Sequence, residues 1–259
     1  MAALEINKSE NGVWTLTLNH PKTKNALTGT GLIDELITAF EEVETDKSCR
    51  VVILRGANGV FSSGGNIHEM ARQTDPNLLS DSLRYEYTEG IQRIPRVMHR
   101  LEVPIIASID GAAIGAGLDL ACMCDIRIAS DKARFAESFV KLGIVPGDGG
   151  AWFLQRIIGM SRAAEMSYTG DMISAQTALD WGLVSRVVTS EQLLEETQLL
   201  ANKIAANPAS AMRMSKRLLR EAQMNSLETV LELSAAFQAI AHKTQEHKEP
   251  VDRFLNKKA

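Results

Sequence analysis

The segment at residues 105–130, IIASIDGAAIGAGLDLACMCDIRIAS, restricts the possible folds of this chain more than any other part of it. Its two apolar ends are typical of strands buried on both faces, and a glycine-rich turn and a short apolar helix lie between them. Gly111, Gly115 and Gly117 stand where the backbone turns sharply or approaches another segment closely. A turn that opens a helix leaves backbone N–H groups unpaired, so this joint can bind an oxyanion or a phosphate. It can equally be a strand–helix connection without a ligand.

The wider pattern predicts an α/β protein with largely parallel strands. Strand–turn–helix units recur up to about residue 170, and residues 50–56 (RVVILRG) form another continuous apolar run. Asn11-Gly12 between two alternating segments predicts a β-hairpin over residues 4–18. From residue 191 onward the pattern is helical. We therefore predict an α/β core over residues 1–190 and a C-terminal helical region over residues 191–259.

Composition excludes several classes of function. The 259 residues carry a formal net charge of −4, which argues against a nucleic-acid-binding protein. No apolar run approaches the ~18 residues of a membrane span, and the N-terminus has no signal pattern, so we expect no membrane partner. Cys49, Cys122 and Cys124 are predicted to be free thiols in a reducing, cytoplasmic compartment. No companion ligands accompany the CxC pair at a usable spacing, so no metal site is predicted.

A second glycine turn, SSGGN at residues 62–66, also follows a buried strand. Two backbone N–H groups that converge from two such turns form an oxyanion hole, which suits the chemistry of a thioester carbonyl. Asp119 and Asp148 are the acidic residues near these turns. A carboxylate in an apolar pocket has a raised pKa and can act as an acid or base near neutral pH. Asp119 can equally stabilise a helix dipole, and Asp148 can be a turn former between glycines.

Other catalytic patterns have less support. Ser62 and Ser63 are not within a GxSxG motif, and no histidine is placed to act as their base, which disfavours a serine hydrolase. No GxGxxG follows a strand and no GxxxxGK[ST] is present, which disfavours a dinucleotide site and a P-loop.

Four segments together resemble the crotonase (enoyl-CoA hydratase/isomerase) superfamily: FSSGGNIHEM, residues 105–130, FAESFVKLGIVPGDGG and GDMISAQTALDWGLVSRVV. The resemblance covers nearly the whole chain. It implies a crotonase-like spiral of ββα repeats with a C-terminal helical region that mediates trimerisation, giving a homotrimer or a dimer of trimers. It also implies an acyl-CoA substrate and no permanently bound cofactor, coenzyme A being part of the substrate thioester.

The resemblance further implies an oxyanion hole made by the backbone N–H groups of Ser63 and Ala116. The positions that it places along CoA or the acyl group are Lys22, Lys24, Ala26, Ser62, Gly64, Gly65, Asn66, Ile67, Gly115 and Phe139.

The departures from the family pattern concern the reaction itself. Family hydratases use two glutamates, which align with Asp119 and with Phe139, and a phenyl ring cannot transfer a proton. Asn66 stands where an aspartate is usual. Family isomerases often carry an acidic residue one position before Asp148, where this chain has Gly147.

These features predict an enzyme that stabilises a thioester enolate and hydrates an enoyl-CoA or shifts its double bond. Asp148 and Asp119 are the expected acid/base residues. Phe139 would make the pocket poor in water, which favours isomerisation. The alternatives are a non-catalytic CoA-thioester-binding protein and a hydrolase of a CoA thioester or a C–C bond.

Overall fold

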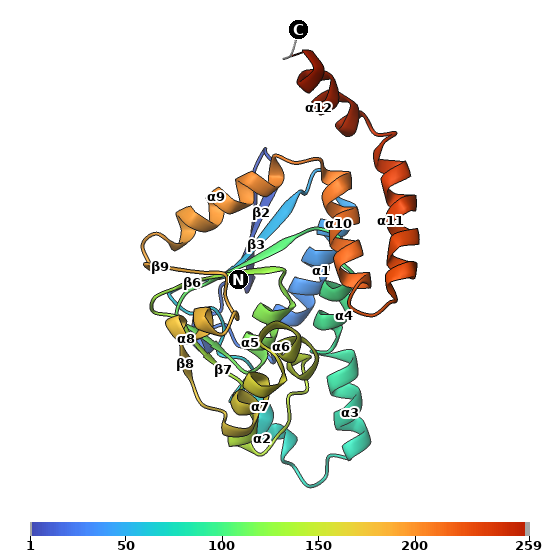
Figure 1. The fold of residues 1–259 in the computed structure, drawn as a ribbon. Helices are drawn as coiled ribbons and strands as arrows, with labels where there is room; N and C mark the ends of the chain where they lie inside the picture. Colours follow the sequence, from blue (N-terminus) through green and yellow to red (C-terminus); the bar gives the residue numbers. More distant parts are fainter. Residues whose placement is uncertain (1, 257–259) are drawn as a thin grey trace.

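The computed structural model describes residues 2–256, and its centre is a twisted six-stranded sheet (Figure 1). In spatial order the strands are β1 (Leu4–Lys8), β2 (Val13–Leu18), β3 (Val51–Gly56), β4 (Ile105–Ile109), β6 (Ile126–Ser130) and β9 (Arg186–Val188). The β1–β2 pair is antiparallel, which confirms the predicted hairpin, and every other neighbouring pair in this sheet is parallel. The predicted α/β architecture is therefore confirmed.

The two faces of the sheet are covered by different helices because successive side chains of a strand point to opposite faces. Val52 and Leu54 belong to the main core with α1 (Leu32–Thr45), whose apolar stripe includes Leu36 and Phe40. Val51 and Ile53 instead pack with α9 (Leu193–Ala205). Continuous apolar runs such as VVIL are required here because both faces are buried.

A second, three-stranded sheet lies next to the first. Its strands are β5 (Ala112–Ile114), β7 (Arg134–Ala136) and β8 (Ile173–Ser174). The remaining elements of this part are α2 (Ile67–Gln73), α3 (Ser80–Glu89), α4 (Arg93–Arg100), α5 (Ala116–Met123), α6 (Gly150–Ile158), α7 (Met160–Thr169), α8 (Ala175–Asp180) and the short 3-10 helices η1 (Pro21–Thr23) and η2 (Ser138–Leu142). An isolated bridge between Ser62 and Ala113 of β5 joins the segment before α2 to the second sheet, close to the start of α5.

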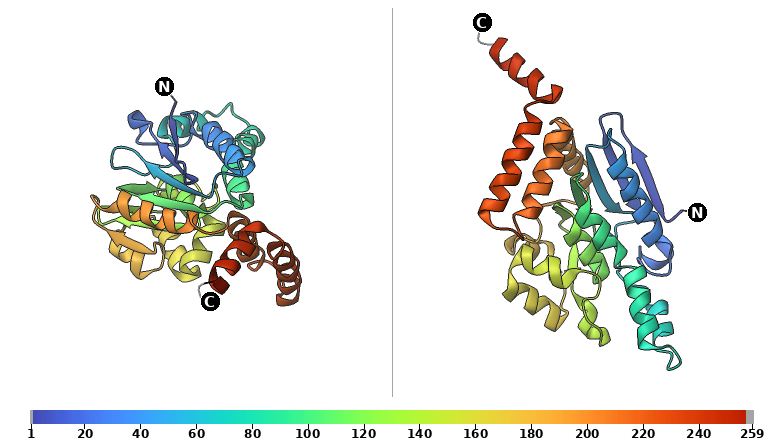
Figure 2. Two further views of the ribbon diagram at one scale, coloured as in Figure 1. Left: turned by 90° about the horizontal axis from the view of Figure 1, so that it is seen from above. Right: turned by 90° about the vertical axis from the view of Figure 1, so that its right-hand side faces the viewer.

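The C-terminal helices divide into two groups. Although it follows residue 190, α9 packs on the sheet, whereas α10 (Ala209–Glu221), α11 (Leu227–Ala241) and α12 (Gln245–Asn256) extend along and beyond the core (Figures 1 and 2). Lys216 of α10 forms an ion pair with Asp125 at 2.7 Å, and the Arg220 guanidinium donates to the carbonyl of His99 at 2.7 Å. These contacts attach α10 to the core, and α11 and α12 are the helices that project from it (Figures 1 and 2). A domain boundary at residue 190 stays a prediction. In residues 2–256, no helix is both long and apolar enough to cross a membrane.

Candidate active site

The two glycine turns found in the sequence lie against each other. The Ser62 N–H donates to Ala112 O at 3.0 Å, and the Ile114 N–H donates to Ser62 O at 3.1 Å. Gly64 has a left-handed φ of +89°, and a Cβ there would collide with Ile114 O and lie 3.2 Å from Ala116 N. Glycine is required because the two backbones pass too closely for a side chain.

The available N–H donors differ from the prediction at one position. The Ser63 N–H donates to Lys24 O at 3.0 Å, and the Gly64 N–H donates to Ser62 Oγ at 3.1 Å. No hydrogen bond within residues 2–256 uses the N–H of Gly65 or of Ala116. The prediction of Ser63 as a donor is therefore wrong, since its N–H is already bonded. The free donors are Gly65 and Ala116.

Three carboxylates meet beside these turns. Asp119 lies in α5, Glu137 follows β7, and Asp148 lies between η2 and α6; their exposed fractions are 0%, 1% and 5%. Gly150 begins α6, and a Cβ there would collide with both Asp119 Oδ1 and Glu137 Oε1. The absence of a side chain at Gly150 lets the two carboxylates approach each other. Sequence reasoning missed Glu137, whose only signal is an acidic residue directly after a buried strand.

Burial controls the charge state of this cluster. None of the three residues takes part in an ion pair of the described chain, and no donor reaches either carboxylate oxygen of Asp119 or of Glu137. Burial, followed by repulsion from Glu137 and Asp148, raises the pKa of Asp119 well above its usual value. The Gly150 N–H opposes this rise, although its geometry falls outside that of a regular hydrogen bond. Burial raises the pKa of Glu137 to about 8 and that of Asp148 to about 6.

A cavity of about 160 Å³ opens beside the cluster, and Asp148 is the one carboxylate of the three that lines it. The Phe139 ring shares this wall and lies 3.6 Å from the position that a Cβ on Gly115 would occupy. Tyr87 of α3 completes the wall; burial and the nearby Asp148 charge raise the pKa of its hydroxyl. The cavity is also lined by Thr28, Ile33, Gly65, Glu69, Met70, Arg72, Gln73, Glu86, Gly90, Ile91 and Ile144. Of the predicted site residues, Gly65, Phe139 and Asp148 line this cavity, whereas Asp119 lies outside the lining.

The remaining predicted binding positions lie in or next to the same loops. Ser62 supports the backbone, because its hydroxyl donates to Asn25 O at 2.7 Å. Asn66 caps α2 by accepting the His68 N–H at 3.0 Å, and the neighbouring Ile67 is exposed.

The loop that carries Lys24 is joined to the second glycine turn by the Ser63 bond to Lys24 O. Lys22 and Lys24 are exposed, and neither forms an ion pair within the described residues. Ala26 is buried, and its carbonyl accepts the Thr30 hydroxyl at 2.8 Å.

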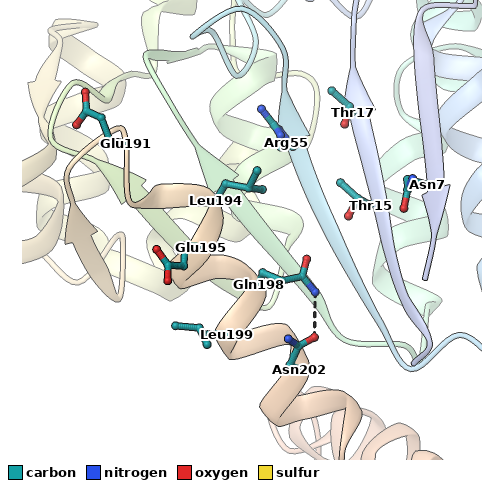
Figure 3. Close-up of a pocket in the computed structure, with 10 residues that line it drawn as sticks. All are labelled: Asn7, Thr15, Thr17, Arg55, Glu191, Leu194, Glu195, Gln198, Leu199 and Asn202. Atoms are coloured by element: carbon teal, nitrogen blue, oxygen red, sulfur yellow. Dashed lines mark hydrogen bonds between the residues drawn. The ribbon is translucent and has the colours of Figure 1, made fainter. Parts of the chain in front are cut away.

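A larger hollow, of about 680 Å³, lies between the sheet and α9 (Figure 3). It is lined by Asn7, Thr15, Thr17, Arg55, Glu191, Leu194, Glu195, Gln198, Leu199 and Asn202. It is open and contains no buried acid or base, so its size does not make it the better candidate for catalysis. Chemistry favours the smaller cavity, which is lined by a buried carboxylate, the glycine with a free N–H at position 65 and an apolar wall.

The sheet arrangement, the facing glycine turns and the buried carboxylates define a crotonase-type α/β protein. The chain belongs to the enoyl-CoA hydratase/isomerase family, whose family model matches residues 8–259.

Two curated relatives illustrate the range of the family. The chain is 33% identical to the 1,2-epoxyphenylacetyl-CoA isomerase of Escherichia coli K12 over 98% of this chain and 96% of the relative. It is 34% identical to the short-chain-enoyl-CoA hydratase of Clostridium acetobutylicum over 98% and 95% of the two chains. In fold, it is similar to the crystal structure of an enoyl-CoA hydratase from Bacillus anthracis, with a TM-score of 0.91, 31% identity and coverage of 99% and 97%.

Proposed function

We propose that this enzyme moves the double bond of an enoyl-CoA between the 3 and 2 positions through a thioester enolate. The observation that carries the proposal is the position of Asp148. It lines the cavity beside an apolar wall, and burial brings its pKa to about 6, so it is ionised and basic near neutral pH.

In the proposed reaction the Asp148 carboxylate removes a proton from C2 of a 3-enoyl thioester. The electron pair moves to the thioester oxygen, which accepts hydrogen bonds from the Gly65 and Ala116 N–H groups. Two such donors stabilise an enolate by several kcal/mol. The proton on Asp148 exchanges with solvent at the cavity that this residue lines. Protonated Asp148 then protonates C4, the double bond forms between C2 and C3, and the carboxylate is regenerated.

Hydration of a 2-enoyl-CoA is the second candidate, because a relative of this chain is named a short-chain-enoyl-CoA hydratase. Phe139 is the observation against it. This ring occupies the wall opposite the glycine turn of Gly115, where it offers no group that could activate water.

A panel of 3-enoyl- and 2-enoyl-CoA thioesters incubated in D2O tests the proposal. We expect 2-enoyl product with deuterium at C4 from the 3-enoyl substrates. A 3-hydroxyacyl-CoA as the main product would favour hydration, and release of free CoA would favour a hydrolase. Tight binding of acetoacetyl-CoA without turnover of any enoyl-CoA would favour the non-catalytic alternative.

The outer end of the cavity predicts a preference for short acyl chains. Arg72 of α2 donates to both Glu86 oxygens on α3, at 3.2 and 2.6 Å, and to Glu69 at 3.1 Å. This ion pair joins two helices that line the cavity, so it restricts the space for a long acyl chain. The restriction is weak, because an exposed ion pair contributes little energy. For Arg72→Met we expect kcat/KM for a ten-carbon enoyl-CoA, relative to a four-carbon one, to rise about threefold to tenfold.

Arg93→Met is the matched control for this prediction. It removes the Arg93–Asp34 ion pair of 2.7 Å, and neither of those residues lines the cavity. An equal change of the ratio in both variants, or no change in Arg72→Met, would contradict the assignment of Arg72 to chain length.

We also propose that the chain forms a homotrimer or a dimer of trimers, with the C-terminal helices α10, α11 and α12 between copies of the chain. Leu219, Leu227, Leu231 and Ile240 on α10 and α11 are all more than half exposed, which leaves an apolar surface uncovered in one chain. Light scattering should give about three or six times the 28.3 kDa mass of the chain.

The CoA moiety is proposed to lie along the loops of Lys22, Lys24 and Ala26, since this segment is bonded to the glycine turn of the site. A cytoplasmic location also stays a prediction, and the three free cysteines, all buried, agree with it.

A further inference from the structure

The Asp119–Glu137 contact requires a chemical explanation beyond the reaction proposed above. The two side chains are 0% and 1% exposed, and neither lines the cavity that Asp148 enters. Their four carboxylate oxygens have no donor within the described chain. Buried polar groups of native proteins are almost always hydrogen-bonded, so two adjacent carboxylates without donors need a proton between them.

Electrostatic repulsion also indicates that a proton lies between Asp119 and Glu137. Two ionised carboxylates in contact repel each other strongly in a poorly solvated environment, and one of the pair keeps its proton. A third anion, Asp148, is close enough to disfavour ionisation of both. The least costly state near neutral pH therefore keeps a proton on the Asp119–Glu137 pair, while Asp148, which borders the cavity, is ionised.

We propose that Glu137 and Asp119 share a proton and act as one positioning unit, which leaves Asp148 as the working base of the cluster. Gly150 makes this arrangement possible, because any side chain there would occupy the space between the two carboxylates. The role of Asp148 rests on the proposed function, whereas the sharing of a proton does not.

The groups that face the pair support this charge state. Cys122, on the same helix as Asp119, is a buried thiol whose pKa is raised to above its usual range. Asp148 approaches from the joint before α6, and Gly150 presents only its N–H. Within residues 2–256, no lysine, arginine or histidine forms an ion pair with either carboxylate, so no cation can take over the function of the proton.

Infrared titration of the free enzyme tests the sharing of the proton without any substrate. The wild-type signal of neutral carboxyl groups should persist at pH 7 and decrease near pH 8, where Glu137 titrates. Glu137→Gln and Asp119→Asn should each lose their last neutral-carboxyl signal at a lower pH than the wild type, because repulsion from the second carboxylate is gone. A neutral Asp119 signal that is unchanged in Glu137→Gln would overturn the proposal.

Thermal stability gives a second readout that is independent of activity. A carboxyl group with a raised folded-state pKa stabilises the fold at low pH and loses this contribution as the pH rises through its folded-state pKa. For the pKa of Glu137 this window runs from the usual value of 4.5 to about 8. We expect the melting temperature of Glu137→Gln, relative to the wild type, to rise by about 5 °C between pH 5 and pH 9. A difference that does not change with pH would contradict the proposal.

The pH profile of kcat/KM connects the pair to catalysis. The wild type should lose activity below about pH 6, where Asp148 is protonated. It should lose activity again above about pH 8, where the Asp119–Glu137 pair loses its proton and the added negative charge opposes the enolate. In Glu137→Gln, kcat/KM should no longer fall above pH 8. In Glu137→Asp, the fall above pH 8 should be present again. A merely structural role would lower activity by the same factor at every pH. Should Glu137→Gln fail to fold, Asp119→Asn is the second variant for all three measurements.

Discussion

Asp148→Asn is expected to reduce kcat for the double-bond shift by about 10³-fold, with KM within about threefold of the wild type. General-base catalysis contributes about 10²–10⁴-fold to a rate, and an amide of the same size cannot accept the proton. Asp148 forms no ion pair in the described chain, so its replacement leaves no opposite charge unpaired. Removing the buried carboxylate should also leave the fold intact, because burial disfavours its charged form.

Hydrogen–deuterium exchange separates loss of the base from loss of substrate binding. With a 3-enoyl-CoA in D2O, the wild type should exchange the C2 protons, and Asp148→Asn should bind the thioester without exchange. Asp171→Asn is the matched control, since this aspartate is exposed and bonded to Lys141 at 2.8 Å away from the cavity. Full activity of Asp148→Asn on its best substrate would remove Asp148 from the mechanism.

The wild-type pH dependence follows from the same residue. Its pKa of about 6 predicts that kcat/KM rises with pH through that value, as the carboxylate form increases. The contribution of Asp148 to stability has the opposite direction, because the folded state favours its neutral form. This contribution is lost as the pH rises from the usual pKa of 3.8 to the folded-state pKa of about 6. Activity and stability are therefore expected to change in opposite directions in this window.

Gly64→Ala is expected to destabilise the fold by about 2–4 kcal/mol and to abolish most of the activity. A left-handed backbone costs a residue with a Cβ about 1–2 kcal/mol, and overpacking adds about 1–3 kcal/mol. At Gly64 the new methyl group would collide with the backbone oxygen of Ile114, which cannot rotate away. The collision pushes apart the two turns that present the Gly65 and Ala116 N–H groups, so stability and enolate binding should fall together.

Gly65→Ala is the matched control one residue further along the chain. A Cβ at Gly65 would meet mainly the terminal methyl of Met70, which can move, and the φ of this residue is not in the left-handed region. We expect its free energy of unfolding to stay within about 1 kcal/mol of the wild type. Chemical denaturation of both variants measures this difference. Equal stability of Gly64→Ala and the wild type would show that the turns are not in the close contact described here.

Local patterns in the sequence were sufficient for most of the architecture. The apolar run at residues 51–54 predicted a strand buried on both faces. Leu36, Ile37, Phe40 and Val43 likewise recur at helical spacing in the sequence, and they form the buried side of α1. The glycines at the two turns marked where the chain reverses beside the site, and in the structure Gly64, Gly111 and Gly115 have a positive φ. These features could be read because side-chain periodicity and the conformational freedom of glycine are properties of short segments.

The segment at residues 105–130 shows the limit of that reasoning. By itself it predicted a strand, a glycine turn that opens a helix and leaves backbone N–H groups unpaired, and an acidic residue, Asp119, in that helix. Only the tertiary structure showed that the Gly65 N–H is free, whereas the Ser63 N–H is bonded to a carbonyl from the distant loop of Lys24. It likewise decided that Asp119 meets Glu137 behind the cavity, while Asp148 borders it. The physical reason is that free donors and charge states depend on contacts between segments far apart in the chain, which no local pattern encodes.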